Sequence, residues 1–94
     1  MKKATKWDVS ECLETEADIV AYLNAALEDG DTSVITTALG DIARTKGMTQ
    51  LARETGITRD GLYKALSPTG NPSFDTVQKV VKAFGLRFDI SSTT

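Results

Sequence analysis

Residues 47–66 decide the fold, and they run GMTQLARETGITRDGLYKAL. The first part, residues 48–55, has apolar side chains along one face of a helix about two turns long. Gly56 can adopt a positive φ and turn the chain sharply after that helix, because it has no Cβ. Thr58 can then cap a second short helix over residues 59–66. Two short helices joined by a tight turn form a helix-turn-helix pattern.

The apolar residues of this stretch predict how its two helices pack together. Ala52 is small where the second helix is expected to cross, and Ile57 fills the angle between the helices. Leu62 and Leu66 lie one turn apart and anchor the second helix to the core. A second helix placed in this way enters the major groove of DNA with its N-terminal residues at the base edges. The side chains left pointing outward are Arg59, Asp60, Tyr63 and Lys64.

Helices are also predicted on both sides of this stretch, so the sequence indicates an all-α fold. Upstream, apolar residues recur at helical spacing in two segments, from Thr15 to Asp29 and from Asp31 or Thr32 to Gly47. A short amphipathic piece over 9–13 precedes them. Downstream, Ser73 can cap a final helix. The apolar face expected for that helix consists of Phe74, Val77, Val80, Val81 and Phe84.

Residues 86–90, LRFDI, alternate apolar and charged side chains, which is the period of a β-strand. An antiparallel pair centred on Phe88, formed with a two-fold mate, would place Arg87 opposite Asp89 of the other chain. Leu86, Phe88 and Ile90 would then be buried between the two chains. The alternative is that this segment covers the core of its own monomer.

Length and composition predict one domain and weigh against an enzyme. The chain has 94 residues, of which 40% are hydrophobic and 26% charged, as is ordinary for a globular protein. Within this one domain we expect N-terminal helices over 8–47, a helix-turn-helix over 48–66, a final helix over 73–84 and a strand over 86–90. It has no histidine and one cysteine, Cys12, which excludes a disulfide within the chain, a Cys/His zinc site and the commonest general base. We expect no cofactor. No apolar run is long enough to span a membrane or act as a signal peptide, so we expect a cytoplasmic protein without a membrane partner.

The formal net charge of -2 hides a strong asymmetry along the chain. The segment 1–7 carries +3, the segment 8–41 carries nine acids and no base, and the segment 42–94 carries eight bases and four acids. Such asymmetry suggests two partners, because the basic part can meet phosphates and the acidic part can meet something basic. The alternative is that these charged residues only form the solvent-exposed faces of the helices and bind no partner.

Several segments together resemble a known family. They are GMTQLARETGITR at 47–59, LYKALS at 62–67, GNP at 70–72, and the upstream IVAYLNAALE at 19–28 and ALGDIAR at 38–44. Over about residues 5–90 the chain is similar to the probable addiction-module antidote proteins, a HigA-like antitoxin group of the Cro/XRE helix-turn-helix superfamily. The resemblance implies a compact lambda-repressor-like domain of five to six helices. It also implies a homodimer that neutralises a small RelE/ParE-like toxin and represses their shared operon by binding operator DNA.

The resemblance places three residues at base-facing positions of the recognition helix. Arg59 can bind a guanine with two hydrogen bonds, and Lys64 can donate to guanine or to phosphate. Asp60 can accept from a cytosine amino group, or it can simply stabilise the helix N-terminus. Gly61 is unexpected inside such a helix, where it costs about 1 kcal/mol relative to alanine. It either lets the helix backbone approach DNA closely or indicates that the helix recognises DNA weakly.

Five further residues are candidates for contacts to the DNA backbone, and each has a structural alternative. Thr58 is the expected N-cap and can also reach a phosphate, while Thr49 and Gln50 open the first helix and serve either as caps or as phosphate contacts. Tyr63 either donates to phosphate or packs on the final helix. Asn71 lies in the loop after the recognition helix and either faces phosphate or forms the turn.

Two other functions remain open from the sequence. One is a stand-alone XRE-type transcriptional regulator without a toxin. The other is an interaction module whose second helix does not read DNA, which the negative net charge and Gly61 favour. Catalysis is a distant alternative, because no glycine-rich phosphate loop or nucleophile-base pair accompanies the carboxylates.

Overall fold

The computed structural model describes residues 13–93, and every regular element within them is a helix. The predicted all-α class is therefore confirmed for this part of the chain. The short helix predicted over 9–13 falls almost wholly outside the described residues, as does Cys12. The five helices are α1 (Glu16–Asp29), α2 (Thr32–Lys46), α3 (Met48–Thr55), α4 (Arg59–Ala65) and α5 (Phe74–Ala83).

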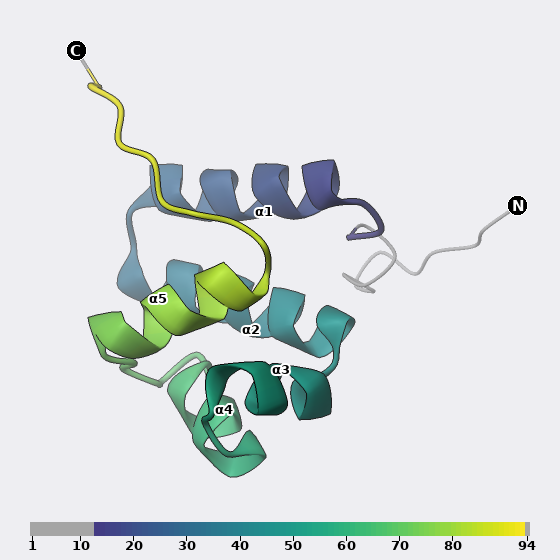
Figure 1. Cartoon of the computed structure of the whole chain (residues 1–94). Coiled ribbons are helices and arrows are strands. Elements are labelled where there is room, and N and C mark those ends of the chain that lie inside the picture. The colour runs from purple at the N-terminus through teal and green to yellow at the C-terminus, as the bar shows by residue number, and fades with distance from the viewer. Residues whose placement is uncertain (1–12, 94) are drawn as a thin grey trace, which may run out of the picture.

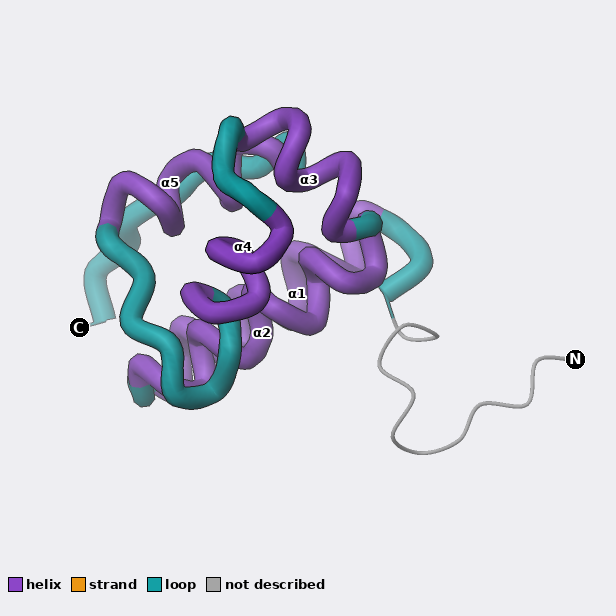
Figure 2. Tube along the Cα trace, turned by 90° about the horizontal axis from the view of Figure 1, so that it is seen from below, coloured by secondary structure: helices purple, strands orange, loops and turns teal. Residues whose placement is uncertain are grey.

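The helices pack in an order that leaves α4 at one end of the molecule. Helix α1 lies along α2, and α3 contacts α2, α4 and α5. Figure 1 shows α1 and α4 at opposite ends, with α2, α3 and α5 between them. Figure 2, seen from below, shows α4 facing the viewer beside the loop that leads to α5. The N-terminal helix and α4 therefore present separate surfaces.

The helix ends follow the local signals in the sequence. The side chain of Thr15 accepts from the backbone N–H of Asp18, and the carboxylate of Asp18 accepts from the backbone N–H of Thr15, which together form a capping box. Asp31 rather than Thr32 caps α2, because its carboxylate accepts from the Ser33 N–H at 2.8 Å. Ser73 caps α5 as predicted.

The apolar stripes predicted for the helices form the core, with three exceptions. Val20 and Leu27 of α1 are partly exposed, and Phe74 at the start of α5 is 69% exposed. The face expected for α5 is therefore wrong at its first residue, which lies beyond the core and stacks its ring on Phe88 at 6.0 Å between centroids. The buried apolar residues are Leu13, Ile19, Leu23, Ala26, Ala38, Leu39, Ile42, Ala43, Met48, Leu51, Leu62, Leu66, Val80, Val81 and Phe84.

Gly40 lets α2 approach the end of α4 more closely than any other residue could. A Cβ at this position would lie 2.5 Å from the carbonyl oxygen of Leu66, which is backbone and cannot rotate away. We expect Gly40→Ala to lower the free energy of unfolding by about 1–3 kcal/mol, since the overpacking outweighs the gain in helix propensity. Urea denaturation measures this change. Gly61→Ala is the comparison, because its Cβ would meet only side-chain atoms, at 3.1 and 3.2 Å, and we expect a smaller loss there than at Gly40. A Gly40→Ala variant more stable than wild type would contradict the prediction.

Candidate nucleic-acid interface

A tight turn joins α3 to α4, as the sequence predicts. Gly56 has a φ of 77°, and its N–H donates to the carbonyl of Ala52 at 2.9 Å, which ends α3. The hydroxyl of Thr55 accepts from the N–H of Ile57 at 3.2 Å. The side chain of Ile57 packs against the core. The direction in which α4 leaves the turn is therefore fixed by both hydrogen bonds and packing.

The inner side of α4 is held by two buried leucines and by a cap. Leu62 is fully buried and Leu66 is 2% exposed, so both anchor residues lie where the sequence predicts them. The hydroxyl of Thr58 accepts from the N–H of Gly61 at 3.0 Å and so caps the helix. These contacts decide which side of α4 remains in solvent.

The outer side of α4 carries the residues predicted to read DNA. Arg59, Asp60, Tyr63 and Lys64 are all exposed, and together they cover the face of α4 that turns away from the core. The guanidinium of Arg59 lies 5.9 Å from the centre of the Tyr63 ring, which places it in cation–π range. This contact favours an Arg59 side chain that lies along the helix surface. Tyr63 is 44% exposed, so part of its ring is open to solvent.

The remaining predicted contacts lie at the start of α3 and in the loop after α4. Thr49 and Gln50 are exposed in the first turn of α3, and neither caps that helix, because Gly47 is the N-cap residue and makes no side-chain cap bond. The amide of Gln50 donates to the carboxylate of Glu54 at 2.9 Å. Asn71 is exposed in the loop. The capping alternative for the two α3 residues is therefore wrong.

Gly61 has a packing explanation that the sequence does not provide. A Cβ there would lie 3.1 Å from the Thr58 hydroxyl oxygen and 3.2 Å from Cγ2 of Ile57. Both distances are tighter than ordinary side-chain contacts. The glycine therefore makes room for the cap and for the turn residue, and the structure supplies a reason for it other than a weakened DNA reader.

The loop after α4 is folded tightly onto the end of that helix, which the sequence shows only as a turn-forming composition. The hydroxyl of Ser67 donates to the carbonyl of Lys64 at 3.0 Å, and the N–H of Gly70 donates to the carbonyl of Ser67 at 2.8 Å. A Cβ at Gly70 would collide with the carbonyls of Lys64 and Ala65. A glycine is therefore required for the loop to pack this closely against the end of α4, a role that sequence reasoning missed.

The C-terminal segment does not form the predicted strand. Residues 86–93 contain no strand in the single chain. Instead, the N–H of Leu86 donates to the carbonyl of Val81, and the Leu86 side chain packs against the core. Arg87, Phe88 and Asp89 lie beside α1 and α5, where they line a shallow groove with Val20 and Leu27 among others. Ile90 is 94% exposed.

These features define a small protein that is helical throughout its described part, with a cation-bearing helix exposed after a tight turn. Comparison with known proteins gives the family: its model, described as the probable addiction module antidote protein, matches residues 3–92. The chain belongs to this family. It is also 52% identical over 87 residues to an uncharacterized protein of Haemophilus influenzae, and the match covers 93% of this chain and 90% of the relative. No solved structure matches the chain.

Family membership indicates an antitoxin role and implies a toxin partner in general, since an antidote acts against a toxin. Within residues 13–93, no helix is long and apolar enough to cross a membrane.

Proposed function

We propose that this protein is a DNA-binding antitoxin that neutralises a small RelE/ParE-like toxin and represses the operon that encodes both. The observation that carries the proposal is the exposed face of α4 in a chain that belongs to the antidote family. That face offers two cations and an acid on a helix anchored by Leu62 and Leu66. The proposed role is binding rather than catalysis.

In the DNA-binding half of the proposal, α3 and α4 act as a helix-turn-helix of the Cro/XRE type. Helix α4 enters the major groove, where Arg59 donates to guanine, Asp60 accepts from cytosine, and Lys64 donates to guanine or phosphate. Thr49, Gln50, Tyr63 and Asn71 contact the backbone and set the register of the protein on the duplex. Their exposure at the start of α3, on α4 and in the following loop supports this assignment.

A homodimer would match a palindromic operator, and we propose one for this protein. Exposed apolar side chains support it: Phe88 and Ile90 of the C-terminal segment, and Phe74, which stacks on Phe88. Pairing of residues 86–90 with a second chain would cover the exposed Ile90 and would supply the hydrogen-bonding neighbour that a strand needs.

The proposal is tested at the native locus of this gene. We expect the product of the adjoining reading frame to arrest growth when it is expressed alone, and we expect this protein to restore growth when both are expressed. Native mass spectrometry of the purified complex should then give two copies of this chain together with the toxin. A harmless product, or an arrest that this protein does not relieve, would favour a stand-alone regulator instead.

A further inference from the structure

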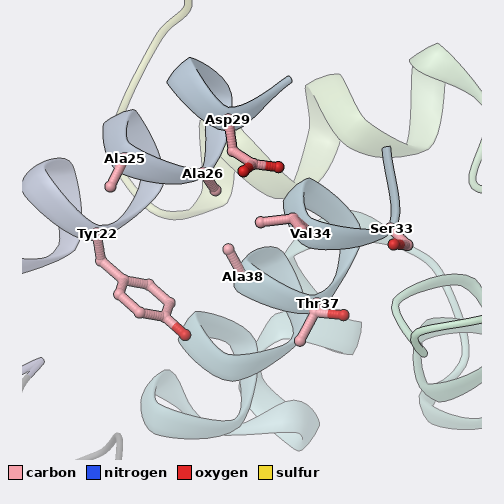
Figure 3. Close-up of a pocket in the computed structure, with 8 residues that line it drawn as sticks. All are labelled: Tyr22, Ala25, Ala26, Asp29, Ser33, Val34, Thr37 and Ala38. Atoms are coloured by element: carbon pink, nitrogen blue, oxygen red, sulfur yellow. The ribbon is translucent and has the colours of Figure 1, made fainter. Parts of the chain in front are cut away.

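A groove of about 420 Å³ runs between α1 and α2, and no residue of the proposed DNA-binding surface lines it. Figure 3 shows its walls: Tyr22, Ala25 and Asp29 come from α1, whereas Val34, Thr37 and Ala38 come from α2. Three of the residues that line it are alanines, Ala25, Ala26 and Ala38. Val34 lies within it and is 41% exposed, so the groove offers an apolar surface to a partner.

The two ends of the groove differ in charge. At one end the hydroxyl of Tyr22 donates to Asp41 at 2.6 Å, and the guanidinium of Arg44 pairs with the same carboxylate. At the other end Asp29 lines the groove, and its carboxylate accepts from the N–H of Asp31 at 3.3 Å. No base is paired with Asp29 or Asp31 among the ion pairs of the described residues. The negative charge of the groove that has no basic partner therefore lies at the turn between α1 and α2, on Asp29 and Asp31.

The carboxylate of Asp31 is held in its charged form by Ser33. The hydroxyl and the backbone N–H of Ser33 both donate to it, at 2.9 and 2.8 Å, and these hydrogen bonds lower the pKa of Asp31 from its usual value. Asp29 lies in the last turn of α1, near the negative end of the helix dipole, and that turn carries no basic residue. An acid is unfavourable at a helix C-terminus. Helix stability therefore does not account for Asp29.

Apart from Arg44, which is paired with Asp41 at one end, the surround of the groove is acidic. Residues 13–41 include no lysine or arginine, and their acids are Glu14, Glu16, Asp18, Glu28, Asp29, Asp31 and Asp41. A second copy of this chain, docked by a two-fold axis on the groove, would place these acids against their own equivalents. DNA phosphates would be repelled in the same way. Charge complementarity therefore selects a basic partner.

We propose that this groove is the docking site for the toxin, which inserts an apolar side chain over Val34 and places cations against Asp29 and Asp31. This inference rests on the proposed antitoxin function and adds the place where the toxin binds. The acidic surround would steer a basic toxin to the groove and make the association rate depend on salt. Since α1 and α4 lie at opposite ends of the molecule, α4 stays accessible to DNA while the toxin is bound.

Two substitutions test the groove, and each has a reason to leave the fold intact. Asp29→Lys replaces an acid in the last turn of α1 by a base, which the helix dipole favours. It also removes the acceptor of the exposed Asp31 N–H, which water can replace. Ala25→Arg fills the groove from an exposed position with a good helix former. Glu28→Lys is the matched control, because it makes the same change of charge one residue away, at a position that does not line the groove. Circular dichroism and thermal unfolding check that all three variants fold.

The measurement is calorimetric titration of each variant with the purified product of the adjoining reading frame, at low and at physiological salt. We expect Asp29→Lys and Ala25→Arg each to raise Kd by about tenfold or more, and Glu28→Lys to change it much less. An equal loss of toxin affinity in all three variants, or no loss in Asp29→Lys and Ala25→Arg, would overturn the groove as the docking site. The antitoxin function would still stand in either case. A change in self-association of the isolated variants with unchanged toxin affinity would instead assign the groove to a second copy. If wild-type protein does not bind the product, the antitoxin function itself fails.

Discussion

Replacement of Leu62 by alanine is expected to lower the free energy of unfolding by about 2–5 kcal/mol. Leu62 is among the largest fully buried side chains of the described chain, and it anchors α4 to the rest of the core. The substitution removes buried apolar surface and leaves a cavity that the helices around it fill only in part. A domain of this size has only about 5–15 kcal/mol of stability in all, so a large part of it would be lost.

Chemical denaturation of Leu62→Ala against wild type measures this loss, with Leu27→Ala as the matched control. Leu27 is 39% exposed on α1, so the same chemical change there should cost much less. The comparison separates burial from the identity of the side chain. A loss at Leu62 no larger than at Leu27 would contradict the packing of α4 described above.

Local signals explain why so much of the helical framework could be predicted from the sequence. The capping box of Thr15 and Asp18, the positive φ of Gly56 and the cap at Thr58 each depend on residues within a few positions of one another. The buried stripes follow from the helical period, which places Leu62 and Leu66 on the same side of α4. Such features can therefore be predicted without knowledge of any long-range contact.

The features that could not be predicted depend on contacts between distant segments. The close approach of Gly40 to the carbonyl of Leu66 joins two helices that are far apart in the chain, so the glycine gives no local signal of its role. Alternation of apolar and charged residues predicts a strand at 86–90, but the same alternation also allows Leu86 to pack on its own monomer. Phe74 has the right spacing for the core face of α5 and lies beyond the end of that core.

The candidate sites also combine features that the sequence predicts with features that it does not. The exposed positions of Arg59 and Lys64 follow from the helical period once Leu62 and Leu66 are assigned to the core, whereas their proposed role in reading DNA comes from the family resemblance. The groove between α1 and α2 carries no motif, since its residues are ordinary ones on two helices. The sequence shows only that the surrounding segment is acidic.

Removal of both cations from α4, by Arg59→Ala with Lys64→Ala, is expected to weaken binding to the operator by about tenfold or more. Loss of a side chain that makes two hydrogen bonds to guanine costs about 1–3 kcal/mol and relaxes preference at one base position, which is the effect expected for Arg59. Loss of a phosphate contact weakens binding to all sequences alike and makes the log–log dependence on salt shallower by about one, which is the effect expected for Lys64 if it meets phosphate. Both side chains are exposed, so their removal should leave the fold unchanged.

Fluorescence anisotropy with a duplex from the region upstream of the gene, titrated at several salt concentrations, measures both effects. The matched control is Lys79→Ala with Lys82→Ala, which also removes two positive charges, but from α5. Lys79 pairs there with Asp75 at 3.0 Å. Because net charge alone contributes a non-specific attraction, the control should lose some affinity for any duplex and keep its preference for the operator. If the α4 double variant binds the operator as tightly as the α5 double variant, then α4 is not the helix that reads DNA, and the exposed cations serve another contact.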